Sequence, residues 1–155
     1  MPQVIAGQST DLTKSVAQLV KELLETNWPT TAYDVLRADI GFGQGSWDDY
    51  GDIDIHVNPA EGESETYDLS GTFSKVTDPV VVNLFYRKNV EEIPDLVGKA
   101  MRKAEEIIKD NMRNLGQGIP MLIWNGWGEV FEDDNLKDVW HAQGRASAIY
   151  WRVKT

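Results

Sequence analysis

Three residues able to bind a metal or move a proton lie close together in the sequence, where polar and apolar side chains alternate. They are Asp52, Asp54 and His56. Side chains two residues apart project from the same face of a strand, so these three would share one face and leave the other apolar. Hard cations prefer clustered oxygens, however, and zinc prefers more than one nitrogen or sulfur ligand. We therefore favour a solvated strand face, and a metal site at these residues is the weaker alternative.

A Gly-Ser pair, Gly45-Ser46, precedes this stretch. The combination resembles the signature of polymerase-β-type nucleotidyltransferases, in which a Gly-Ser turn and an Asp-x-Asp strand hold magnesium against a triphosphate. The resemblance implies that Asp52 and Asp54 would bind the magnesium. Only Trp47 to Gly51 separate the two parts, too few residues for the helix that this family has there, and none of them is basic. A nucleotidyltransferase is therefore an alternative, and we expect a protein that is not an enzyme, with no catalytic residues and no cofactor.

Two other motifs do not define a site. Gly41, Gly43 and Gly45 follow a predicted strand, as in a dinucleotide-binding loop, but no helix begins after them. His141 cannot be combined with a nucleophile and an acid into a catalytic triad. We expect His141 to be an ordinary surface side chain.

The elements that must position these residues centre on an apolar stretch from Val80 to Lys88. Its β-branched and aromatic residues occupy both faces, so it cannot be an exposed edge and should be a central strand. A long helix follows, beginning near Glu91 or Pro94 and reaching Leu115, with Gly116 as its stop. Its apolar spacings of three and four residues predict one stripe packed across the sheet. The stripe comprises Ile93, Leu96, Val97, Ala100, Met101, Ala104, Ile107, Ile108, Met112 and Leu115.

Shorter elements surround this pair. A first helix is predicted from Thr10 to Thr26, capped by Ser9 or Thr10 and ended by Trp28-Pro29. Strands are predicted over residues 36–42, 52–57, 66–76, 119–130 and 146–153, with turns at 77–79 and 132–135. The order helix, three or four strands, helix, two strands predicts an α+β fold. We expect a mainly antiparallel or mixed sheet of about four to six strands with two amphipathic helices packed on it.

The composition restricts the classes of function. A chain of 155 residues is expected to form a single α+β domain over 1–155. Its formal net charge of −10 repels a phosphate backbone, which disfavours ordinary nucleic-acid binding. Without cysteine it can form neither disulfides nor thiolate metal sites. No apolar stretch approaches the roughly 20 residues of a membrane helix and no secretion leader is recognisable, so we expect a soluble protein with no membrane partner.

Tryptophan is abundant, with six residues in the chain. Tryptophan is enriched in the buried centres of protein interfaces as well as in cores. Trp124 and Trp127 lie beside glycines, an arrangement that suits a surface pressed by a neighbour. We expect the subunit interface to include Trp47, Trp124 and Trp127, and core packing remains the alternative for each.

The whole chain resembles the tail-terminator and neck (head-tail joining) proteins of long-tailed bacterial or archaeal viruses. The features that carry the resemblance are the order of elements, the acidic loops, the Arg87-Lys88-Asn89 connection into the long helix and the final strand ending in Ile149-Tyr150-Trp151-Arg152-Val153. The resemblance implies a homo-oligomeric ring, usually a hexamer, that joins the tail tube to the connector and neck proteins of the head. Genome DNA would pass through the ring without sequence-specific binding. The protein would be part of the virion, after assembly in the host cytoplasm.

Acidic side chains lining such a ring would keep DNA sliding, because they repel phosphate. The expected lumen-facing residues are Asp48, Asp49, Glu61, Glu63 and Glu65. Ring closure would also cover the open edges of the sheet. A small cytosolic adaptor protein is a second alternative to the viral ring.

Overall fold

The computed structural model describes residues 12–29, 38–41, 53–60, 64–67, 73–87, 94–117, 119–132 and 139–153. Within these residues the elements follow the predicted order of helix, four strands, helix and two strands. They are α1 (Val16–Asn27), β1 (Ala38–Gly41), β2 (Ile53–Pro59), β3 (Ser64–Tyr67), β4 (Phe73–Arg87), α2 (Pro94–Asp110), β5 (Met121–Glu132) and β6 (Val139–Val153). The predicted α+β fold is confirmed.

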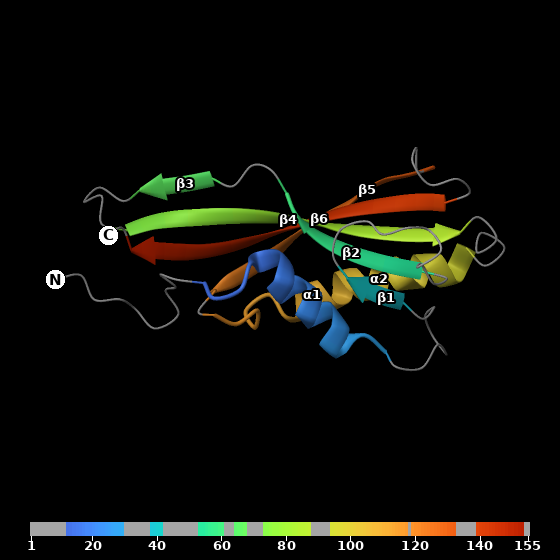
Figure 1. Cartoon of the computed structure of the whole chain (residues 1–155), viewed down its shortest axis with the longest axis horizontal. Helices are drawn as coiled ribbons and strands as arrows, with labels where there is room; N and C mark the ends of the chain where they lie inside the picture. The colour runs from blue at the N-terminus through green and yellow to red at the C-terminus, as the bar shows by residue number, and fades with distance from the viewer. Residues whose placement is uncertain are drawn as a thin grey trace.

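The strands form one mixed sheet in the order β1-β2-β4-β6-β5, and β3 pairs with β4. The β1–β2 pair is parallel and the other pairs are antiparallel. β4 and β6 run side by side along the length of the sheet (Figure 1). β4 is buried from Val80 to Tyr86 and lies between β2 and β6, so the predicted central strand is confirmed.

The region before the central strand differs from the prediction. In place of a strand over 66–76 and a turn at 77–79, β3 is short and β4 runs unbroken through Pro79. The Pro79 carbonyl accepts a hydrogen bond from the backbone N–H of Ala60 at 3.0 Å. In an antiparallel strand the N–H and C=O of one residue point to the same side. The N–H that proline lacks would therefore face the gap between β2 and β3, and the ladder between β4 and β6 stays complete.

α1 begins later than predicted. Its N-cap is Ser15, and not Ser9 or Thr10, because the Ser15 Oγ accepts a hydrogen bond from the backbone N–H of Gln18 at 3.1 Å. Before it, the N–H and hydroxyl of Thr13 both donate to Oε1 of Gln117, at 3.1 and 2.8 Å, which ties this segment to the turn after α2. The end of α1 agrees with the prediction, since Trp28 adopts the extended conformation that a following proline favours.

α2 ends at Asp110, one turn or more before the predicted Leu115. The Asn111 side chain donates to the carbonyl of Ile107 at 2.8 Å, and its backbone N–H bonds to the carbonyl of Ile108 in a tight turn. Gly116 does adopt a positive φ of 93°, but in a later turn and not at the helix end. Met112, predicted to belong to the buried stripe, is consequently exposed.

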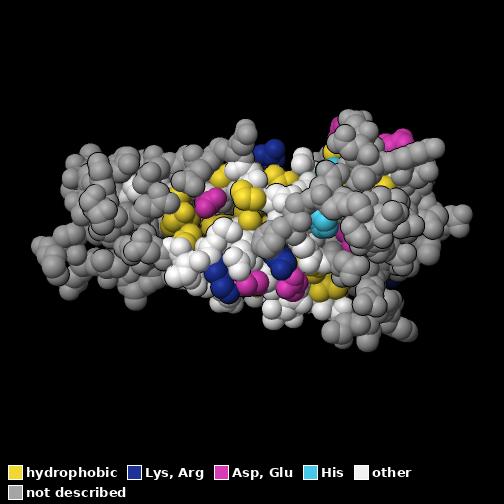
Figure 2. Space-filling view, viewed as in Figure 1, with side chains coloured by type: hydrophobic (Ala, Val, Ile, Leu, Met, Phe, Trp, Pro, Cys, Tyr) yellow, Lys and Arg dark blue, Asp and Glu magenta, His cyan; other side chains and the backbone are white. Residues whose placement is uncertain are grey.

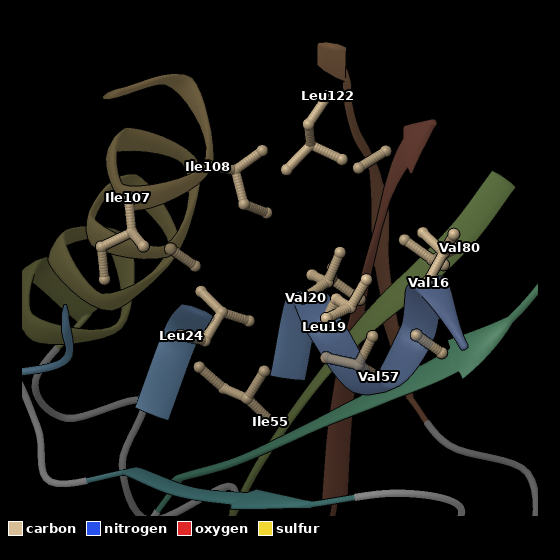
Figure 3. Packing of buried hydrophobic residues seen from close by; sticks show 14 of the residues in the cluster. Val16, Leu19, Val20, Leu24, Ile55, Val57, Val80, Ile107, Ile108 and Leu122 are labelled. Atoms are coloured by element: carbon tan, nitrogen blue, oxygen red, sulfur yellow. The ribbon is translucent and has the colours of Figure 1, made fainter. Parts of the chain in front are cut away.

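Both helices pack on the same face of the sheet. α1 contacts β1, β2 and β4, while α2 contacts β5 and α1. Figure 3 shows Leu24 of α1 lying between Ile107 of α2 and Ile55 of β2. Leu24 and Ile55 are fully buried, and burying a side chain of this size contributes about 1.5–3 kcal/mol to folding. This cluster forms the main core.

The last two strands have bounds other than those predicted. β5 continues to Glu132, which was expected in a charged turn, and β6 begins at Val139 instead of Ala146. The glycines of β5 mark irregularities and do not end the strand: its register with β6 shifts between Trp124 and Gly126 and again after Trp127. None of the described helices is long and apolar enough to cross a membrane.

Candidate functional site

One face of the sheet carries neither described helix, and we call it the outer face. Strand register places six polar or aromatic side chains next to one another on it, from three adjacent strands. They are Asp54 and His56 of β2, Asn83 and Phe85 of β4, and His141 and Gln143 of β6. Both histidines of the chain therefore lie on one face of the sheet. Asp54 and His56 share this face, as alternation predicts.

A row of rings crosses the outer face. Phe85 stacks on His141, with ring centres 4.3 Å apart and planes inclined by 26°. The His56 ring meets the Phe85 ring edge-on, with ring centres 5.6 Å apart. The Phe131 ring of β5 lies beside the His141 ring, with ring centres 4.7 Å apart. Cross-strand ring contacts of this kind stabilise a sheet by about 0.5–1.5 kcal/mol per pair beyond area burial. The row links β2, β4, β6 and β5.

Asn83 connects the polar side chains of the outer face. Its Oδ1 lies 2.7 Å from Nε2 of His141 and accepts a bond from Nε2 of Gln143 at 3.2 Å. Its Nδ2 donates to the backbone carbonyl of His56 at 3.4 Å. Because Oδ1 can only accept, Nε2 of His141 must carry a proton and donate. In neutral His141 the remaining lone pair is therefore on Nδ1.

Two predictions about the outer face were wrong. Asp54 was expected to face solvent, but only 2% of it is exposed, and its register partner on β4 is Phe85. β2 lies between β1 and β4, and Phe85 of β4 lies opposite Asp54 in the register, whereas His56 on the same face is only half-buried. His141 was expected on the surface, but it is half-buried within the ring row.

The alternative metal site gains no third ligand among the described residues. No group of three or more His, Asp or Glu side chains able to hold a metal occurs in the part of the chain that the structure describes. Asp52, the third residue of the predicted set, lies outside the described residues. Asp54 and the two histidines of the outer face are thus distributed along a row rather than gathered around one point.

Trp124 and Trp127 of β5 lie on the helix-covered face of the sheet. Their rings meet edge to face, with centres 5.1 Å apart and planes inclined by 65°, and they pack against the main core. The indole N–H groups of both are buried and have no hydrogen-bond partner among the described residues. Core packing, the alternative stated for these tryptophans, accounts for this position. Their role as interface anchors stays a prediction.

Most of the other predicted site residues fall outside the described residues. These are Trp47, Asp48, Asp49, Glu61 and Glu63. Glu65 lies in β3, where its backbone pairs with Val76 of β4. Which residues would face a lumen therefore stays a prediction.

Among the described strands β5 forms one edge of the sheet, so one row of its backbone groups has no partner strand within that part of the chain. Its final residues are exposed, including Val130 at 41% and Phe131 at 42%. Large apolar side chains at an open edge are typical of a surface that another chain covers. Sequence reasoning missed this feature because it ended the strand at Val130.

The polar surface of the helices is arranged as local ion pairs. Over α1, basic and acidic side chains lie next to one another on the molecular surface (Figure 2). Lys21 lies 2.9 Å from Glu25. Lys14 donates to both carboxylate oxygens of Glu22, and this bond lowers the pKa of Glu22 below its ordinary value. Such pairs are exposed to solvent and screened by it, so they add little to stability.

Comparison with known proteins adds no identification. No protein-family model matches the chain, and no curated protein matches it.

Proposed function

We propose that the chain is a structural component of a virion, namely a tail-terminator or neck subunit that forms a ring between the tail tube and the head connector. The observation that carries the proposal is the combination of element order and open edge. The order of helix, four strands, helix and two strands is the order on which the resemblance rests, and β5 is an edge strand among the described strands. A closed ring would cover such an edge and so prevent open-ended aggregation.

The charge of the chain supports a passage for DNA. Subunits with a net charge of −10 would repel the phosphates of the genome. Binding to DNA depends on basic side chains that displace counterions from the phosphates, and an acidic surface opposes this. DNA would then slide through the ring without being held. We call the hydrogen bonds of Asn83 and the ring row of the outer face the outer-face network. In this proposal the network keeps the sheet rigid and takes no part in catalysis.

The burial of Asp54 supports a non-catalytic role. A nucleotidyltransferase needs two carboxylates that can reach a magnesium-bound triphosphate. At 2% exposure, Asp54 is enclosed beside the ring row and does not present its carboxylate to a ligand in solution.

The proposal is tested by the mass and shape of the purified full-length protein. Light scattering should give a mass near six times that of the 17.5 kDa chain, and negative-stain electron microscopy should show rings. Magnesium and ATP should not raise the melting temperature, and a DNA duplex at low salt should not bind. A monomer stabilised by magnesium and ATP would support the nucleotidyltransferase instead, and a monomer indifferent to both would support the small adaptor.

A further inference from the structure

Large exposed hydrophobic side chains occur in two places within the described residues. The first is the end of α2, where Met112 is 41% exposed. The neighbouring charged residues Lys109, Asp110 and Arg113 are exposed too. Lys109 lies 3.3 Å from Glu105, and Arg113 has no ion pair among the described residues. We call Lys109, Met112 and Arg113 the α2-end patch.

The second place is the end of β5, at the open edge of the sheet. Val130 and Phe131 are 41% and 42% exposed, and adjacent residues of a strand project from opposite faces. The exposed acidic residues Glu129 and Glu132 flank them. We call these four residues the β5-end patch. It combines exposed apolar surface with acidic charge, whereas the α2-end patch combines exposed apolar surface with two basic residues.

The two patches lie at opposite ends of β5. The backbone N–H of Leu122, near the start of β5, donates to the carbonyl of Met112 at 2.6 Å. Phe131 lies nine residues further along the same strand. At about 3.3 Å per residue, the patches are roughly 30 Å apart. They cannot meet within one molecule, but they can meet between two copies.

The charge distribution favours a second copy as the partner. The whole chain carries 15 basic and 25 acidic residues, so two copies repel each other in most orientations. The described segment 94–117, which contains α2 and the turn after it, in contrast carries five basic and four acidic residues. This segment is nearly neutral within a strongly acidic chain, so the acidic end of β5 from another copy is repelled less here than by the chain as a whole, and the exposed basic residues Lys109 and Arg113 attract it locally.

We propose that the α2-end patch of one copy packs against the β5-end patch of the next. Met112 would contact the ring of Phe131, since thioether sulfur packs favourably at aromatic rings. Arg113 and Lys109 would face Glu129 and Glu132. Because the two patches differ, the contact is heterologous and repeats in one direction until a ring closes. This inference deepens the proposed ring and rests on it.

Two double variants test the contact. Met112→Asp with Arg113→Glu alters only the α2-end patch, and Val130→Ser with Phe131→Ser alters only the β5-end patch. Each should weaken self-association more than about tenfold in sedimentation velocity. Arg102→Glu, the same charge reversal as at Arg113 but at an exposed position of α2 outside both patches, is the control and should assemble as the unaltered chain does. Circular dichroism should show that all three variants remain folded.

Mixing the two double variants provides the decisive result. Each retains one intact patch, so an equimolar mixture should form a dimer of one copy of each and should grow no further. Assembly that survives in both variants would overturn the contact while leaving the proposed ring in place. Assembly lost only in the β5-end variant would mean that β5 pairs with itself, which also overturns the contact.

The unaltered chain gives two further outcomes. Open filaments that both variants abolish would support the contact and overturn the ring. An unaltered chain that stays monomeric would overturn both the contact and the ring.

Discussion

Gly144 of β6 lies against the ring of Trp124 on β5, with no room for a β-carbon between them. A methyl group at residue 144 would overlap the far edge of that ring and would lie 2.9 Å from Cε3 of Trp127. We expect Gly144→Ala to lower the free energy of unfolding by about 1–3 kcal/mol, because both tryptophans must move within a packed core. Urea denaturation measures the change. Gly98→Ala, in α2 with no atom near its added methyl, is the control and should be stabilising by about 0.5–1 kcal/mol.

Phe85 is the centre of the ring row, and only 4% of it is exposed. We expect Phe85→Ala to cost about 3–5 kcal/mol and Phe85→Asp to prevent folding, because a carboxylate would replace the ring stacked on His141. Circular dichroism and urea denaturation distinguish the two results. Asp52→Ala should leave the fold and assembly intact. A soluble Phe85→Asp protein with unaltered near-ultraviolet dichroism would show that the outer face is not part of the buried structure.

The Asn83 carboxamide is an acceptor shared by His141 and Gln143. Asn83→Ala should destabilise the protein by about 1–3 kcal/mol, because two half-buried donors lose their acceptor. A double-mutant cycle with His141→Phe isolates the bond between the two side chains. We expect a coupling free energy of roughly 0.5–1.5 kcal/mol from urea denaturation of the four proteins. Strict additivity of the two substitutions would contradict the hydrogen bond.

The hydrogen bond from Lys14 lowers the pKa of Glu22 below its ordinary value of 4.5, with Gln18 as a weaker donor. A depressed carboxyl pKa means that the folded state favours the ionised form. The resulting stability is present above the ordinary pKa and is lost as the pH falls through the lowered one. In Lys14→Ala, the pKa of Glu22 should rise towards 4.5 in an NMR titration, with little change in stability at pH 7. If the pKa of Glu22 is unchanged in Lys14→Ala, the bond from Lys14 is not the cause of its lowering.

The parts of the fold that could be predicted from sequence depend on local pattern. The apolar residues from Val80 to Tyr86 allow only a central strand, and the spacing of apolar residues in α1 and α2 identifies the helices. Pro79 was misinterpreted because its effect depends on a distant residue. A proline ends a strand when its missing N–H belongs to a ladder, and whether it does depends on where Ala60 and β3 lie.

The outer-face network shows the same limit for the candidate site. Asn83 is 58 residues from His141 and 60 from Gln143, and only the register of β4 against β6 brings them together. Alternation correctly placed Asp54 and His56 on one face, but it assumed that polar residues face water. The burial of Asp54 depends on the strands on either side of β2, which no local pattern contains.

The long pairing of β4 with β6 has a consequence for the order of folding. Its residue pairs join Phe73 to Val153 at one end and Arg87 to Val139 at the other, and α2 and β5 lie between the two strands in the chain. The central ladder therefore cannot form during synthesis until β6 has been made. Contacts between such distant residues slow folding, because a long loop must close before they form. Until then the apolar residues of β4 need protection, so a nascent chain truncated before Val139 should depend on chaperones.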